Sequence, residues 1–198
     1  MNHALSVRLP AAGNTAFVDD ALNRIYVPMA NDTVYVIDQS TLTPIDSIAL
    51  PAGSNPMEMT YVPSKNHLYV VAQNRQSLLV IDAATDQVVN ELIGQASFPS
   101  RVVYDQKRGR IFTAGFNGFF VDQFDVATEQ YIGFQSVDNA YSGGLAVNQK
   151  TGRLYIPEYQ AGVMEVYDYF TPGGPISRVP PLRIPKPLRA RAKVAARR

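Results

Sequence analysis

The sequence repeats itself with a period of 43 residues. An aromatic residue marks each copy, at Tyr26, Tyr69, Phe112 and Tyr155. A basic residue and then an isoleucine or leucine precede every one of these aromatic positions. Because several columns match at one spacing, the chain is predicted to consist of serial copies of one supersecondary unit.

Each copy predicts four short β-strands. In the second copy these strands span residues 57–63, 67–73, 77–82 and 87–93. They are rich in Val, Ile, Leu and Tyr, and turn-forming Asn, Asp, Gly and Pro residues separate them. Residues 1–170 show no helical periodicity. Four antiparallel strands in about 40–45 residues are typical of one propeller blade, so we expect an all-β propeller of about four blades over residues 1–170.

An Asp-x-x-Thr unit also recurs in every copy, beginning at Asp38, Asp82, Asp125 and Asp168. An aspartate at the end of a strand accepts hydrogen bonds from backbone N–H groups just ahead of it, and a threonine three residues on adds another local bond. We therefore interpret these aspartates as structural turn residues. A second column, Asn31, Asn74 and Asn117, falls in turns that need a positive φ, which asparagine tolerates.

The second copy reads NHLYVVAQNRQSLLVIDAATDQVVNELIG, residues 66–94. This pattern, and its Val-Ile-Asp-x-x-Thr turn in particular, resembles the YVTN family of β-propeller repeats over roughly residues 5–170. The resemblance implies the propeller fold, and it leaves the function open. Relatives occur among surface and exported proteins, lactonase-like enzymes and electron-transfer enzymes, and they usually have more than four blades.

The low blade count leaves three arrangements open. Residues 6–14, SVRLPAAGN, resemble the outer strand and exit loop at 47–55, SIALPAGSN, and residues 175–179 are predicted to supply the outer strand of the fourth blade. The N-terminal strand completes the fourth blade and closes a ring, or the blades form an open arc that a partner or second copy completes, or the chain is a fragment of a larger propeller. We favour the arc, whose exposed edges call for a partner.

The sequence offers little for catalysis. It has two histidines without metal-ligand spacing and no cysteine, so neither a metal site nor any other cofactor is predicted. Phosphate-loop and nucleophile-elbow motifs are absent. The sequence shows neither a signal peptide nor a membrane-spanning segment, which leaves the compartment unknown, although the resembled family is often extracytoplasmic.

Residues on one predicted face are the candidate ligand- or partner-binding set. Glu58 and Arg101 occupy one column near the channel mouth, where they form a simple ion pair or grip a polar ligand. The neighbouring loops add Arg75, Phe116, Asn117, Tyr141 and Tyr159. Aromatic and arginine side chains gathered on an exposed face suit a protein interface, although packing against neighbouring loops is the alternative.

The last 28 residues differ from the rest of the chain. Residues 171–198 are proline-rich and carry eight Lys or Arg and no acid, whereas residues 1–170 carry 10 Lys or Arg and 17 Asp or Glu. We predict an extended tail with a possible short terminal helix. As an anchor it would dock on an acidic protein surface or anionic lipid, and nucleic acid is disfavoured by the acidic body. The alternative is a disordered, solubilising tail or one that contacts the acidic body of its own chain. The anchoring side chains would be Arg183, Lys186, Arg189, Arg191, Lys193, Arg197 and Arg198.

Together these patterns predict a non-catalytic interaction module or accessory subunit of a larger assembly, whose partner is another protein or a second copy of the chain. The alternatives are a lactonase- or lyase-like propeller enzyme with a site at the channel, and a truncated propeller remnant.

Overall fold

The structure is a computed structural model that describes residues 5–137, 142–158, 162–168 and 177–178. These residues form four antiparallel sheets, each a meander of four strands that are consecutive in sequence. Blade 1 contains β1 (Phe17–Asp19), β2 (Arg24–Met29), β3 (Thr33–Asp38) and β4 (Pro44–Ala49). Blade 2 contains β5 (Pro56–Val62), β6 (His67–Ala72), β7 (Ser77–Asp82) and β8 (Gln87–Ile93), with a 3-10 turn η1 (Gln73–Arg75).

The second half of the chain repeats this plan. Blade 3 contains β9 (Pro99–Asp105), β10 (Arg110–Gly115), β11 (Phe120–Asp125) and β12 (Gln130–Ser136). Blade 4 contains β13 (Ala146–Val147), β14 (Leu154–Pro157), β15 (Met164–Asp168) and β16 (Ser177–Arg178). The expected all-β architecture of four-stranded blades is confirmed, and the strands of blade 2 lie within one residue of their predicted bounds.

The middle strands of blades 2 and 3 are buried on both faces. In β7, Leu78, Leu79, Val80 and Ile81 are all inaccessible to solvent, whereas the outer strand β8 is mostly exposed. This difference arises because blades stack face to face, so a middle strand between two other blades is mostly apolar. An outer strand lies at the sheet edge and tolerates polar residues.

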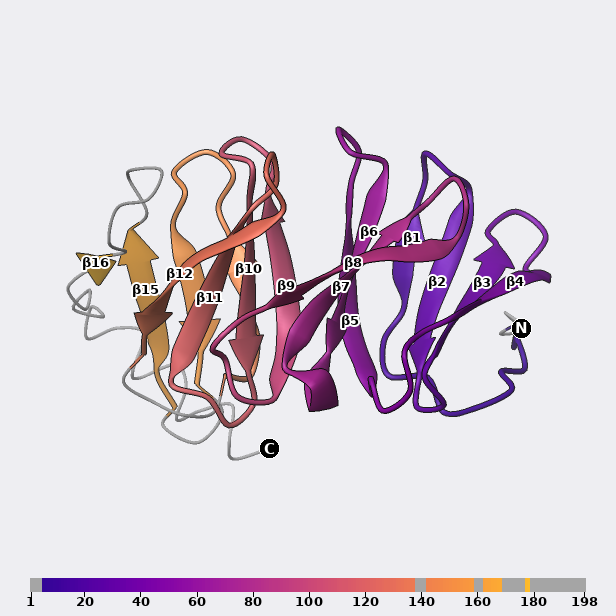
Figure 1. The fold of residues 1–198 in the computed structure, drawn as a ribbon, viewed down its shortest axis with the longest axis horizontal. Helices are drawn as coiled ribbons and strands as arrows, with labels where there is room; N and C mark the ends of the chain where they lie inside the picture. Colours follow the sequence, from indigo (N-terminus) through magenta and orange to yellow (C-terminus); the bar gives the residue numbers. More distant parts are fainter. Residues whose placement is uncertain (1–4, 138–141, 159–161, 169–176, 179–198) are drawn as a thin grey trace, which may run out of the picture.

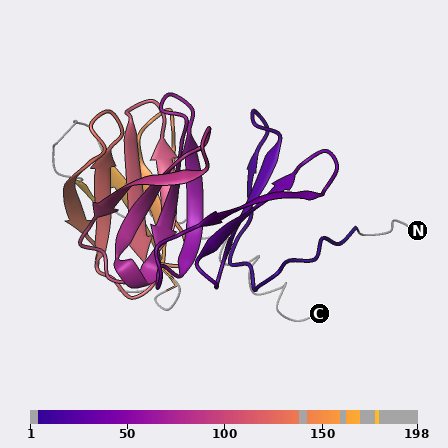
Figure 2. The ribbon, with the colours of Figure 1, turned by 45° about the vertical axis from the view of Figure 1, so that its right-hand side comes forward.

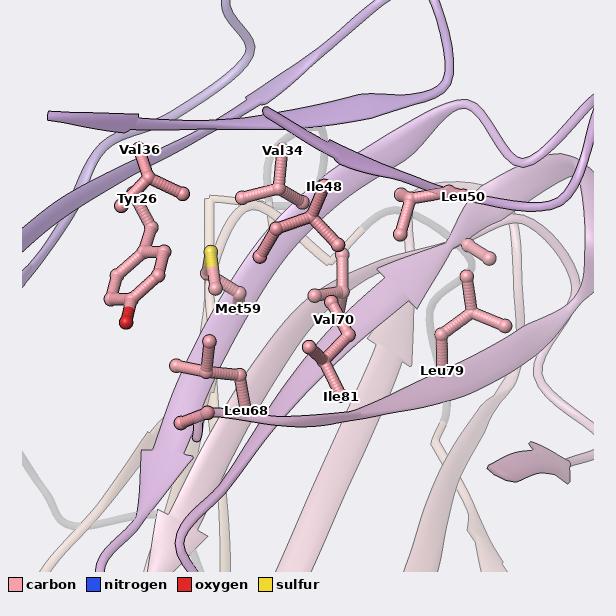
Figure 3. Close-up of a cluster of buried hydrophobic side chains, with 12 residues drawn as sticks. Tyr26, Val34, Val36, Ile48, Leu50, Met59, Leu68, Val70, Leu79 and Ile81 are labelled. Carbon is pink, nitrogen blue, oxygen red and sulfur yellow. The ribbon is translucent and has the colours of Figure 1, made fainter. Parts of the chain in front are cut away.

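One hydrophobic cluster fills each space between successive blades. Between blades 1 and 2, Tyr26, Val34 and Val36 pack against Leu68 and Val70 (Figure 3). Equivalent clusters join blade 2 to blade 3 and blade 3 to blade 4. Full burial of one such aliphatic side chain stabilises the fold by about 1.5–3 kcal/mol, so these clusters hold the stack together.

The four blades form an open arc. Blades 1 and 4 lie at opposite ends of the long axis (Figure 1), and in the described part of the chain no hydrophobic cluster joins them. The prediction that the N-terminal strand could complete blade 4 is wrong, because β16 occupies the outer position of that blade and pairs with β15. The N-terminal segment lies beside blade 1, whose inner strand it leads into. Asn14 N–H donates to the Pro28 carbonyl at 2.9 Å, and Ala30 N–H donates to the Ala12 carbonyl at 2.9 Å.

The N-terminal segment covers the outward face of blade 1 (Figure 2). Val7 and Leu9 pack there against Val27, Met29 and Ile37. Within the repeat, Val7 and Leu9 correspond to Ile48 and Leu50, which pack against blade 2 in the next interface. The segment therefore occupies the place that the outer strand of a preceding blade would take.

The predicted outer strand of blade 4 is present as β16, which pairs with β15 through Asp168 and Ser177. It falls inside the stretch that the sequence assigned to the tail. The basic residues from Arg183 to Arg198 lie outside the described residues. No described helix is long and apolar enough to cross a membrane.

Candidate functional site

The loops gather on two opposite faces of the arc. On one face, which we call the loop face, the loop that enters each inner strand lies beside the loop between the second and third strands. Phe116 N–H donates to the Phe98 carbonyl at 3.2 Å and Asn74 N–H donates to the Ser54 carbonyl at 3.3 Å. On the other face, the turn face, tight hairpin turns meet, and Ala83 N–H donates to the Asn66 carbonyl at 3.0 Å.

Three phenylalanines are exposed on the loop face of blade 3. Phe98 and Phe116 are 47% exposed and Phe119 is 52% exposed, and we call these three residues the aromatic cluster. Two loops carry them, residues 94–98 and residues 116–119. The sequence predicted Phe116 as a contact residue and missed Phe119, because an isolated aromatic in a Gly-rich turn gives no signal until the turn is placed.

Two glycines bring these loops together. A Cβ atom at Gly115 would lie 2.1 Å from the Ser97 carbonyl oxygen, and one at Gly118 would lie 2.9 Å from the same oxygen. Both contacts are with backbone, which cannot move aside easily. The close approach holds the two loops together, so the backbone positions of the three phenylalanines are fixed relative to one another.

Glu58 makes a bond between two blades. Its carboxylate accepts a hydrogen bond from the Val102 N–H of the neighbouring inner strand at 2.8 Å. Burial raises the pKa of the Glu58 carboxyl, and the Val102 N–H and the Arg101 charge oppose this rise. Among the described residues no ion pair within 4.0 Å joins Glu58 to Arg101, whose guanidinium donates to the Ser100 carbonyl at 3.1 Å.

The same column also bridges blades 1 and 2. Thr15 stands one repeat before Glu58, and its hydroxyl donates to the Met57 carbonyl at 3.0 Å. The side-chain amide of Asn14 donates to the Pro56 carbonyl at 2.6 Å. The side chains of Asn14, Thr15 and Glu58 therefore join neighbouring inner strands. Glu58, which the sequence marked as a ligand candidate, has a structural role here.

The other predicted residues of this face are spread apart. Arg75 donates two hydrogen bonds to Glu91, both at 2.8 Å, and so is held at the edge of blade 2. Asn117 is exposed between Phe116 and Gly118, beside the aromatic cluster. Tyr141 and Tyr159 lie outside the described residues. In the described part of the chain, no group of three or more His, Asp or Glu could hold a metal ion.

Three of the repeated aspartates accept hydrogen bonds within the turns of the opposite face, and the turn after Asp168 lies outside the described residues. Asp38 accepts hydrogen bonds from the Thr41 N–H at 2.8 Å and the Thr41 hydroxyl at 2.9 Å, and Asp125 accepts the same pair from Thr128. Asp82 accepts from the N–H groups of Ala84 and Thr85 at 2.7 and 3.1 Å. Asp168 accepts from the Arg153 guanidinium at 2.6 Å.

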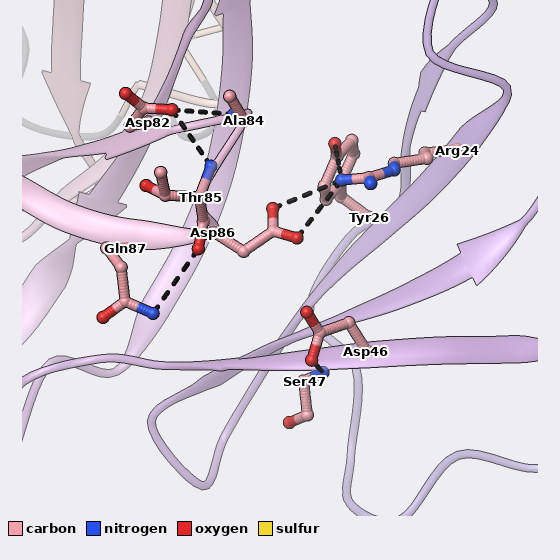
Figure 4. A network of polar contacts seen from close by, with 9 residues as sticks. All are labelled: Arg24, Tyr26, Asp46, Ser47, Asp82, Ala84, Thr85, Asp86 and Gln87. Carbon is pink, nitrogen blue, oxygen red and sulfur yellow. Dashed lines mark hydrogen bonds and ion pairs between the residues drawn. The ribbon is translucent and has the colours of Figure 1, made fainter.

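A polar contact joins blades 1 and 2 across the turn face (Figure 4). Arg24 donates to both carboxylate oxygens of Asp86 at 3.3 Å and to the Tyr26 hydroxyl at 3.4 Å. One repeat later, Glu129 accepts from the Tyr69 hydroxyl at 2.7 Å and contacts His67 Nδ1 at 2.7 Å. We call each contact an inter-blade tie: a basic residue of one blade contacts an acid from the next blade, and a tyrosine hydroxyl beside them hydrogen-bonds to the basic residue in the first tie and to the acid in the second.

The two acids of these ties respond differently to their surroundings. Burial raises the pKa of the Asp86 carboxyl, and the nearby Asp46 charge raises it further, so that Arg24 does not compensate. Burial also raises the pKa of Glu129, but the hydrogen bonds from Tyr69 and His67 outweigh it and the net shift is downward. The ties therefore lie at equivalent places in the repeat but differ in their hydrogen bonds and in their electrostatics.

Comparison with known proteins supports the fold alone. No protein-family model matches the sequence, and no curated protein matches it. Among solved structures, hydrazine synthase of Kuenenia stuttgartiensis superimposes with a TM-score of 0.72 at 14% identity, over 84% of this chain and 48% of that one. The WD40 β-propeller domain of Doa1 superimposes with a TM-score of 0.67 at 12% identity, over 79% of this chain and 51% of that one. The chain spans about half the length of these structures, and it has the fold of a β-propeller.

Proposed function

We propose that this chain is a YVTN-type, non-catalytic propeller module that binds a protein partner and serves as an accessory subunit of a larger assembly. The aromatic cluster carries the proposal. Three phenylalanines that are each about half exposed lie on adjoining loops of one face. Because exposed apolar area costs about 25 cal/mol per Å², side chains held in this way favour a protein surface that covers them.

The polar candidates of the loop face support the same reading. Glu58 is bonded to the next blade and Arg75 to Glu91, so both are engaged within the propeller itself. A contact that uses this face therefore depends mainly on apolar packing, with Asn117 beside the cluster as a polar group. Interfaces of this kind concentrate their binding energy in a few aromatic residues.

The basic tail is the second part of the proposed contact. Beyond β16 the tail carries seven positive charges, and it follows a body with more acidic than basic residues, so the tail would dock on an acidic surface of the partner. Because β16 belongs to blade 4, a truncation that tests the tail should remove residues 179–198 and keep Ser177 and Arg178.

The proposal is tested by affinity purification of the tagged chain from its source cells. Replacing Phe98 and Phe119 together by serine should abolish stoichiometric co-purification of the partner. The matched control replaces Ile45 and Val89, which are 50% and 52% exposed on outer strands of blades 1 and 2. Equal partner recovery with both double variants, at unchanged thermal stability, would remove the loop face from the proposal.

A further inference from the structure

The inter-blade tie occurs where a tyrosine faces an acid, and it is lost where the acid is missing. Arg24 donates to both Asp86 and the Tyr26 hydroxyl, and the Tyr69 hydroxyl donates to Glu129. The third copy has Phe112 at the tyrosine position, and the residue one repeat after Glu129 is Pro172. A tyrosine in this column thus occurs where the next blade supplies an acid, and a phenylalanine occurs where it does not.

Blade 4 has the basic residue and the tyrosine of an inter-blade tie. Arg153 and Tyr155 occupy the columns of Arg24 and Tyr26. Arg153 uses its Nε atom to bond Asp168 of its own blade, and its terminal nitrogens make no hydrogen bond with a described residue. The Tyr155 hydroxyl likewise has no hydrogen-bond partner among the described residues. In blades 1 and 2 the tyrosine of this column lies near an acid from the next blade. Tyr155 therefore predicts an acid that is supplied from outside the described sheets.

The face around Tyr155 is also less buried than its counterparts. Tyr26 and Tyr69 are fully buried, whereas Tyr155 is partly exposed. Met164 is 57% exposed, although Val34 and Leu78 in the same column are fully buried. In blades 1, 2 and 3 this face packs against the next blade. In blade 4 the same face is not covered by the described residues.

A second copy of this chain does not fit this surface. The residue of blade 1 that corresponds to Asp86 and Glu129 is Leu42. All three have a positive φ within their turns: Leu42 at 56°, Asp86 at 55° and Glu129 at 53°. Blade 1 would thus bring a leucine to Arg153 and Tyr155. Its outward face is moreover already covered by Val7 and Leu9.

We propose that the outward face of blade 4 binds a β-blade of a partner protein whose last hairpin turn presents an aspartate or glutamate to Arg153 and Tyr155. The carboxylate accepts hydrogen bonds from the tyrosine hydroxyl and the guanidinium, and the apolar face of the incoming blade covers Met164 and Val166. This inference rests on the proposed function as an interaction module, and it names a different surface from the aromatic cluster.

The test begins with a photoreactive benzoylphenylalanine in place of Tyr155 in the full chain, expressed in the source cells. We expect one cross-linked protein, joined within the last hairpin turn of a four-stranded sheet and beside an acidic residue. The same probe at Val89, an exposed residue of blade 2, should not capture that protein. A cross-link to residues 171–198, a cross-link to a second copy, or no product would each overturn the inference.

Binding of the purified partner then tests the tie itself. Tyr155→Phe keeps the ring and removes only the hydroxyl, so we expect affinity to fall about tenfold, as for loss of a hydrogen bond to a charged group. Replacing the partner's acid by its amide should cause a similar loss, with little further loss when both changes are combined. Tyr35→Phe, on the outward face of blade 1, is the control and should bind normally. Unchanged affinity of Tyr155→Phe would overturn the tie.

The two proposals fail in distinguishable ways. If the Phe98 and Phe119 variant loses its partner while Tyr155 gives no cross-link, the module function stands and the blade-docking inference falls. If neither surface affects partner recovery, both fall.

Discussion

At the scale of single residues, two acids in equivalent positions contribute oppositely to stability. The pKa of Glu129 is lowered by folding, so the ionised carboxylate stabilises the native state above its unfolded pKa of about 4.3, and this contribution is lost as the pH falls through the lower folded pKa. The pKa of Asp86 is raised, so its contribution is present at low pH and is lost as the pH rises through its folded pKa.

This contrast gives a prediction for a matched pair of variants. Glu129→Gln should lower the free energy of unfolding at pH 7 by about 1–2 kcal/mol, the scale of a hydrogen bond to a charged group, and the loss should shrink below about pH 4. Asp86→Asn should cost less at pH 7, because it removes a charge whose burial is unfavourable. Urea unfolding between pH 3 and pH 8 measures both, and parallel pH profiles for the two variants would contradict the assignment.

Glu58 gives a second prediction at this scale. A glutamine can still accept the hydrogen bond from Val102 N–H, and it removes the charge whose burial raises the pKa of this residue. Glu58→Gln should therefore keep or slightly raise the stability at pH 7. Glu58→Ala leaves the Val102 N–H without its acceptor and should cost about 1–3 kcal/mol. Thermal unfolding compares the two, and equal losses would show that Glu58 does not tie the inner strands.

At the scale of elements, the sequence predicted the structures that depend on residues close together in the chain, such as hairpins. The strands of blade 2 were placed within one residue, because turn residues and the apolar runs between them are adjacent in the chain. The partners of Glu58 and Arg75 were not predicted, since they depend on which backbone N–H or carboxylate lies opposite in space. The inter-blade ties were also missed, although the column of basic residues was visible in the sequence. The acids Asp86 and Glu129 follow Arg24 and His67 by 62 residues, so the sequence does not show that they meet.

The two loops under the aromatic cluster supply a prediction for an element. Gly115→Ala would place a Cβ 2.1 Å from the Ser97 carbonyl oxygen, which forces the loops apart. We expect a loss of about 1–3 kcal/mol, the usual cost of overpacking, together with weaker partner binding. Gly144→Ala is the control, because its Cβ meets only side-chain atoms of Pro157 at 3.3 Å. Similar melting temperatures for the two variants would mean that the loop contact is loose.

At the scale of the whole molecule, the repeat predicted the number of blades but not how the arc ends. Residues 6–14 carry the pattern of an outer strand, and a pattern of this kind identifies the type of strand without identifying the sheet it joins. Blade 4 takes β16 as its outer strand, and Val7 and Leu9 pack on blade 1. The two ends of the arc consequently differ: blade 1 is covered by its own chain, and blade 4 presents Tyr155 and Met164.

The cover on blade 1 can be tested directly. Replacing Val7 and Leu9 together by serine should remove about 1 kcal/mol of burial for each side chain, since both are half-buried, and should uncover Val27 and Met29. The variant should unfold at lower urea, bind a hydrophobic dye and self-associate in light scattering. Leu5→Ser is the matched control, because Leu5 lies in the same segment and is 81% exposed. If the double variant remains as stable and as monodisperse as Leu5→Ser, the segment does not seal this end, and both ends of the arc would then be available for partners.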